Sequence, residues 1–160
     1  ASPVARFAVA ELVEATVVAT APVQPVAPGD AARVVGFRLA NLGNGPEAFR
    51  IELEPAAAGS TIALLPRTPA LYVDSDGSGT WTPADLPYAT GAEPALPPDG
   101  TLTLFAVLDV PPDAVDAARA RVTLTARATT GTGAPGTTVA GAGVGGVDAV
   151  LGRSGGAVPA

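Results

Sequence analysis

The chain contains no cysteine, no histidine, no lysine and no methionine. Without cysteine it forms neither disulfides nor thiolate metal sites, so cysteine usage does not indicate a redox compartment. The missing residues also exclude Ser-His-Asp, Cys-His and Schiff-base catalysis in their usual forms. Carboxylate chemistry remains, but of the acidic pairs Glu52/Glu54 and Asp113/Asp116 the first lies on the outward face of an alternating segment. We therefore expect no enzyme activity.

Positive charge is also scarce, with nine arginines against 15 acidic residues and a formal net charge of −6. Because no basic cluster is present, the chain lacks the electrostatic footprint that nucleic-acid binding requires, and an anionic membrane is an unfavourable partner as well. No run of about 18 apolar residues is free of charge, so we expect no membrane span.

Only seven residues are aromatic, so Leu, Val and Ile must do most of the packing. A chain of 160 residues is long enough for one core that buries roughly 70 % of the unfolded surface. The absence of methionine and the start at Ala1-Ser2-Pro3 match what signal-peptide cleavage leaves behind. These features predict a processed, secreted protein.

The stretch from Asp74 to Asp85 has the layout of a twelve-residue calcium loop. Such loops need oxygen ligands at positions 1, 3, 5, 7 and 12, and glycine at position 6 for a sharp turn. Glycine does occupy position 6, as Gly79. The ligand positions hold Asp74, Asp76, Ser78, Thr80 (through its carbonyl) and Asp85.

This loop resembles a dockerin repeat loop, which likewise has glycine at position 4, here Gly77, and Asp at position 12. It differs in having Ser78 at position 5, and Pro83 argues against a long exiting helix. The three carboxylates predict a weak calcium site, with a dissociation constant on the order of 10⁻⁴ M. The alternative is a metal-free turn, since Asp, Gly and Ser form such turns unaided.

Apolar and polar residues alternate along most of the chain, which predicts strands rather than helices. Residues 4–20 would form one strand about three times the usual length, or two collinear ones. Residues 34–42 and 49–54 are expected to pair across a tight turn, residues 86–89 to pair with 70–73 across the loop, and 114–120 to form one helical turn. Further strands are expected at 61–65, 101–110, 121–125 and 147–151.

Two stretches resemble the immunoglobulin-like repeats of bacterial surface proteins. The first is Leu39 to Phe49, an extended run followed by Asn-x-Gly-Asn, a polar turn and an aromatic-led strand. The second is Leu104 to Thr125, in which a strand, a short crossing and a closing strand follow one another. The resemblance implies an all-β fold, an immunoglobulin-like antiparallel β-sandwich with an inserted calcium-binding loop.

The sequence thus divides into three parts. Residues 1–20 are an extended strand that could be donated to another molecule, and residues 21–130 are the β-sandwich with its calcium loop at 74–85. Residues 131–160 hold ten of the 19 glycines and are expected to pack on the domain or on a neighbour. We expect a calcium-stabilised structural subunit of a bacterial cell-surface filament or layer, which associates with itself through exchanged or added strands.

The alternative function is a calcium-dependent adhesin or a carbohydrate-binding accessory module. It depends on Trp81, inside the loop, and on Tyr72 and Tyr88 just outside it, which could form a platform for polysaccharide. Against this, Trp81 could instead be the apolar anchor that fixes the loop onto the domain.

Overall fold

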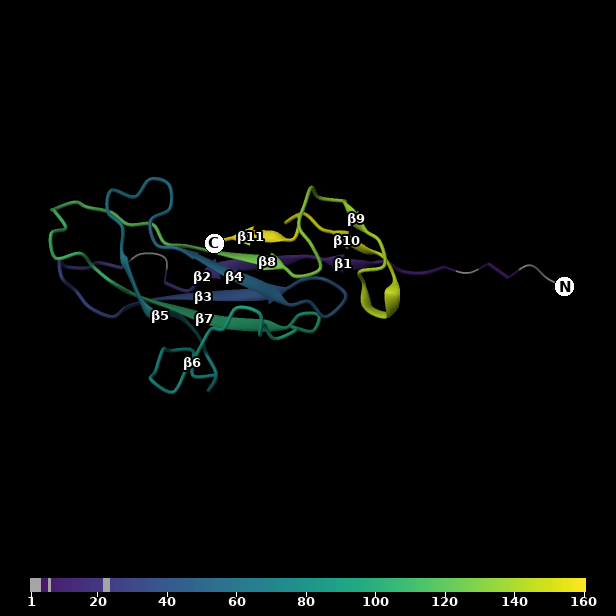
Figure 1. Cartoon of the computed structure of the whole chain (residues 1–160), viewed down its shortest axis with the longest axis horizontal. Helices are drawn as coiled ribbons and strands as arrows, with labels where there is room; N and C mark the ends of the chain where they lie inside the picture. The colour runs from purple at the N-terminus through teal and green to yellow at the C-terminus, as the bar shows by residue number, and fades with distance from the viewer. Residues whose placement is uncertain (1–3, 6, 22–23) are drawn as a thin grey trace.

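The computed structural model describes residues 4–5, 7–21 and 24–160, and its fold is all-β (Figure 1). The strands are β1 (Glu11–Val13), β2 (Ala15–Ala19), β3 (Arg33–Asn41), β4 (Phe49–Glu54), β5 (Leu65–Val73), β6 (Leu86–Pro87), β7 (Thr101–Asp109), β8 (Thr123–Ala128), β9 (Thr138–Val139), β10 (Ala149–Leu151) and β11 (Ala157–Pro159). The one helical segment in the described residues is the short 3₁₀ turn η1 (Val144–Gly146), and no helix there could cross a bilayer.

The strands form three sheets. The largest is antiparallel with the order β2-β3-β7-β5-β6, and the second is antiparallel with the order β11-β8-β4. The third has the order β1-β10-β9, and in it β1 runs parallel to β10. One buried cluster takes residues from the first two sheets, including Phe37, Leu104, Ile51 and Leu124. This arrangement of open antiparallel sheets over a shared core is compatible with a β-sandwich.

The central strand β7 is the most deeply buried element. Leu104, Ala106 and Leu108 on one face are fully buried, and Phe105 and Val107 on the other are only 2–3 % exposed. This confirms the strand predicted at 101–110. The alternating segments at β3 and β4 are also confirmed as strands, with Glu52 and Glu54 on the exposed side of β4.

The predicted pairing of residues 34–42 with 49–54 is wrong. Strand β3 pairs with β2 and β7, whereas β4 pairs with β8 in the other sheet. The turn between them is a corner that crosses from sheet to sheet, held by the fully buried side chain of Asn41. Its amide nitrogen donates to the carbonyls of Gly45 and Leu96 at 2.8 and 2.9 Å, and its amide oxygen accepts the backbone N–H of Gly43 at 2.9 Å.

The N-terminal segment is two short strands rather than one long strand. Strand β1 pairs with β10, and after Glu14 the chain enters the five-stranded sheet as β2, beside β3. Val13 and Val17 are buried, whereas Val9 is 79 % exposed. In the described part of residues 1–10, which we call the N-terminal arm, no residue is in a strand.

Other local expectations fail where turns replace regular structure. Residues 61–64 form no strand, since β5 begins at Leu65, and residues 114–120 form turns instead of a helical turn. The strand predicted at 147–151 is confirmed as β10, but the glycine-rich segment also contributes β9 and β11, which sequence reasoning did not foresee.

Two glutamates hold the glycine-rich segment against the first strands. Glu11 Oε2, on a residue only 6 % exposed, accepts the N–H of Val144 at 2.6 Å. Glu14 accepts the N–H groups of Arg153 and Ser154. Burial raises the pKa of Glu14. The hydrogen bonds from Ser154 and Arg153 together lower it by more than burial raises it, so the pKa of Glu14 lies below its usual value. The carboxylate form of Glu14 therefore stabilises the docked segment.

We expect Glu14→Gln to destabilise the fold by about 1 kcal/mol at about pH 7, the lower end for a charged hydrogen bond because Glu14 is partly exposed. A carboxyl whose pKa is lowered by folding adds stability above its unfolded pKa and loses it as the pH falls through the folded one. The gap between Glu14→Gln and the unmodified protein should thus narrow as the pH falls below the unfolded pKa of about 4.3, and it should close once the pH is below the lowered folded pKa, as measured by urea unfolding. Glu54→Gln, on the exposed face of β4, is the control. A gap that persists in acid would contradict this role.

Candidate metal centre

The predicted calcium loop lies at the edge of the five-stranded sheet, between β5 and β6 (Figure 1). Tyr72 pairs with Pro87 and Val73 with Leu86, so the two ends of the loop are held side by side, as predicted for residues 70–73 and 86–89. The N–H of Asp74 donates to the carbonyl of Thr103 on β7 at 3.0 Å. The loop is therefore fastened to the buried strand of the sheet.

The three carboxylates predicted as ligands come together. One oxygen each from Asp74, Asp76 and Asp85 lies within 4.8 Å of the others. Asp85 is only 4 % exposed, whereas Asp76 is at the surface. Negative charges at such separations repel one another, and a bound cation would remove that repulsion. The cluster is thus electrostatically suited to a cation.

Hydrogen bonds within the loop fix these carboxylates. Asp85 accepts the N–H of Ser75 at 3.1 Å and of Thr82 at 2.7 Å, and Asp74 Oδ2 accepts the N–H of Gly79 at 2.9 Å. A carboxylate offers about four lone-pair sites, so acceptor capacity remains on each after these bonds. The carboxylates are oriented by the backbone and are still able to bind a cation.

The two remaining predicted ligands lie next to each other. Ser78 Oγ donates to the carbonyl of Thr80 at 2.8 Å, and the N–H of Ser78 donates to Asp76 Oδ1 at 2.9 Å. Hydrogen bonds from the side chain and then the backbone of Ser78 lower the pKa of Asp76 and favour its charged form. Gly77 and Gly79 have φ of +69° and +73°, a left-handed backbone that glycine adopts without strain.

The aromatic residues around the loop separate into two groups. Trp81 and Tyr72 meet edge to face, with ring centroids 5.7 Å apart and planes at 69°. Tyr88 instead packs on the core, where its hydroxyl accepts the N–H of Ile51 at 2.9 Å and donates to Glu93 at 2.7 Å. Burial is the main cause of its raised pKa. The three rings therefore do not form a common platform.

No family model, curated protein or solved structure matches this chain. What the loop can do chemically therefore follows from its own geometry. It offers three carboxylates, one hydroxyl and one carbonyl, all hard oxygen donors of the kind that calcium and magnesium prefer. Because calcium takes six to eight oxygens, carboxylates that bind through both oxygens, or water, would complete its coordination.

Sequence reasoning missed the buried acids that organise the rest of the chain. Glu47 is only 3 % exposed, and its Oε1 accepts the N–H and the hydroxyl of Thr129, each at 2.9 Å, and the N–H of Thr130 at 3.2 Å. Its only sequence signal was an acid directly after the Asn-x-Gly-Asn-Gly-Pro turn. That position looked like a solvated turn because its partners are more than 80 residues away.

Trp81 is partly buried, and its Nε1 is shielded from solvent without a hydrogen-bond partner. We expect Trp81→Ala to destabilise the protein by roughly 1–3 kcal/mol through lost packing, and Trp81→Phe by less, because Phe keeps the contact with Tyr72 and adds no orphan donor. Thermal unfolding followed by circular dichroism measures both. An unchanged melting temperature in Trp81→Ala would show that Trp81 is not an anchor for the loop.

Proposed function

We propose that this protein is a calcium-stabilised structural subunit of a secreted bacterial cell-surface assembly, a filament or a layer, whose copies associate through an exchanged or added β-strand. The observation that carries the proposal is the N-terminal arm. Its side chains Val4, Phe7 and Val9 are 80, 93 and 79 % exposed. Exposed large apolar side chains that gather on one segment in this way are a mark of an interaction surface.

The arm is continuous with a paired strand. Strand β1 is bonded to β10 on one side, and on the other Leu12 N donates to Asn44 Oδ1 at 2.6 Å. Asn44 thus covers the second edge of β1, and its cover reaches Ala10, whose carbonyl accepts from Asn44 Nδ2 at 3.2 Å. An extended segment that leaves a sheet in this way supplies backbone donors and acceptors to another sheet edge, while its apolar side chains add affinity.

A contact in which the arm of one copy binds another surface on the next copy is head-to-tail. Such a contact generates an open fibre unless its rotation returns on itself. The resemblance to immunoglobulin-like repeats of bacterial surface proteins supports the same class of function, since those repeats are building blocks of cell-surface structures. We assign the immunoglobulin-like architecture on that resemblance.

Calcium has a structural role in this proposal. Asp74, Asp76, Asp85, the Ser78 hydroxyl and the Thr80 carbonyl would hold the ion, which would neutralise the repulsion among the carboxylates. The ion supplies no chemistry beyond this charge and its coordination bonds. Because these ligands converge only in the folded chain, bound calcium stabilises the native state over the unfolded one.

A second candidate function is a calcium-dependent adhesin or carbohydrate-binding module. It is favoured by one observation, the Trp81–Tyr72 ring pair beside the carboxylate cluster. Its support is smaller because the rings meet at 69° and share no flat stacking surface, and because Tyr88 is engaged elsewhere. Loss of polysaccharide binding in Trp81→Ala with the fold retained would favour this candidate.

Calcium should raise the thermal stability. If the dissociation constant is on the order of 10⁻⁴ M, about 10 mM calcium adds roughly 2.7 kcal/mol to the free energy of unfolding. Melting temperatures are compared in calcium and in EGTA for the unmodified protein, for Asp74→Asn and for the control Asp113→Asn, an exposed acid outside the loop. We expect only Asp74→Asn to lose the calcium response. Equal melting temperatures in calcium and EGTA for the unmodified protein would disprove the site.

Deleting residues 1–10 should abolish self-association and leave the fold intact. The deletion spares β1 and β2, whose Val13 and Val17 belong to the core, so it does not open the domain. Sedimentation velocity measures assembly, and circular dichroism measures folding. A Gly-Ser arm of equal length is the control for the length of the chain, and we expect it to be monomeric too. Normal polymers of the deleted protein would refute assembly through the arm.

A further inference from the structure

A groove of about 350 Å³ opens between two loops at one end of the five-stranded sheet. Its walls are mostly apolar and include Val26, Pro28, Ile62, Val110, Ala114 and Val115. Val115 is 72 % exposed and Val26 is 46 % exposed, although both are large and aliphatic. The groove thus leaves apolar surface in contact with water.

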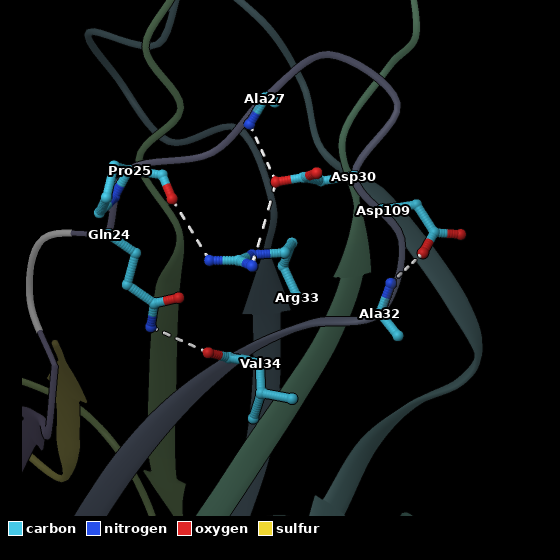
Figure 2. Close-up of polar contacts among 8 residues, drawn as sticks. All are labelled: Gln24, Pro25, Ala27, Asp30, Ala32, Arg33, Val34 and Asp109. Atoms are coloured by element: carbon cyan, nitrogen blue, oxygen red, sulfur yellow. Dashed lines mark hydrogen bonds and ion pairs between the residues drawn. The ribbon is translucent and has the colours of Figure 1, made fainter.

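The loop that forms one wall is fixed by its own polar contacts, which Figure 2 shows. They run from Gln24 Nε2 to Val34 O (2.9 Å), from Arg33 Nη2 to Pro25 O (3.3 Å), from Ala27 N to Asp30 Oδ2 (2.9 Å) and from Ala32 N to Asp109 Oδ1 (2.7 Å). Arg33 also forms an ion pair with Asp30 at 4.0 Å.

Backbone bonds then join this wall to the other. The N–H of Val110 donates to the carbonyl of Asp30 at 2.8 Å, and the N–H of Gly29 donates to the carbonyl of Pro111 at 3.3 Å. A groove held in this way needs little reorganisation to accept an occupant, which lowers the free-energy cost of binding.

The groove and the N-terminal arm lie at opposite ends of the molecule. Ala15, which follows the arm and β1, pairs with Asn41 at the end of β3, whereas Arg33 at the start of β3 pairs with Leu108 beside the groove. The nine residues of β3 separate these ends by roughly 30 Å. In Figure 1 the arm leads away from the body on the right, and the loops that form the groove lie on the left. The arm of one molecule therefore faces away from its own groove.

The arm and the groove also match chemically. Phe7 and Val9 are 93 and 79 % exposed in the arm, and burying an aromatic ring removes about 150–250 Å² of surface from water. The charge also fits, since Arg6 is the one ionisable side chain in the sequence of the arm and Asp116 is an acid among the described residues that line the groove.

We propose that this groove, between residues 26–28 and 110–118, receives the N-terminal arm of a second copy, with Phe7 as the anchor. The inference rests on the proposed self-association through the arm, and it places the arm's apolar side chains in a groove between loops instead of the arm's backbone along a sheet edge. The seven residues 4–10 span at most about 23 Å when fully extended. The contact between two copies therefore buries an area at the low end for specific interfaces. Association should for this reason depend on protein concentration.

The test mixes one variant with a damaged arm and one with a damaged groove. Phe7→Asp lacks the anchor but keeps the groove, and Val115→Asp lacks the groove but keeps the arm. Each alone should associate at least 10-fold more weakly than the unmodified protein. An equimolar mixture should form a heterodimer and nothing larger, because one working arm meets one working groove. Sedimentation velocity and native mass spectrometry measure the species formed.

Val26→Asp is a second groove variant, needed if Val115→Asp fails to fold, and circular dichroism checks each protein. Val18→Asp, at a comparably exposed apolar side chain on β2, is the control and should polymerise normally. If both groove variants polymerise while Phe7→Asp does not, the arm binds elsewhere, and the groove assignment fails but the proposed function stands. If Phe7→Asp also polymerises, or the unmodified protein stays monomeric at all concentrations, both proposals fail.

Discussion

Burial of β7 on both faces is the constraint from which the rest of the structure follows. Strand β7 pairs with β3 over eight residues on one side and with β5 on the other, and Leu104 to Leu108 lie almost entirely out of water. An apolar strand of this kind is stable only at the centre of a sheet with another layer over it. Its neighbours also carry the functional features. Asp74 is bonded to Thr103 on β7, and the groove begins where β7 ends at Asp109.

Carboxylates perform two different tasks in this molecule. In the loop, three of them converge on one another, and their mutual repulsion suits them to a cation. Elsewhere, Glu11, Glu14 and Glu47 each accept backbone N–H groups from distant segments and so fasten glycine-rich or irregular chain to the sheets. Glycine loses much conformational entropy on folding, and charged hydrogen bonds and the pairing of β10 and β11 offset that loss.

The C-terminal segment is paired in a sheet of its own molecule, whereas the N-terminal arm is not, and this difference gives the proposed assembly its direction. The C-terminal segment pairs within its own molecule, since β11 adds to the sheet formed by β8 and β4. The N-terminal arm, in contrast, leaves the body at the end opposite the groove. A subunit with an unsatisfied apolar arm at one end and an unsatisfied apolar groove at the other is directional, as a head-to-tail polymer requires.

The sequence by itself determined which segments are strands at β3, β4 and β7, which of their faces are buried, and the order of oxygen donors from Asp74 to Asp85. These are local properties, because the two-residue repeat of a strand and the spacing of a turn are written in consecutive residues. Only the tertiary structure decided that β3 and β4 lie in different sheets, that Tyr88 bonds to β4 instead of flanking Trp81, and that Glu11 and Glu14 hold the C-terminal segment. Each of these depends on contacts between residues tens of positions apart, and periodicity specifies the face of a strand but not its partner.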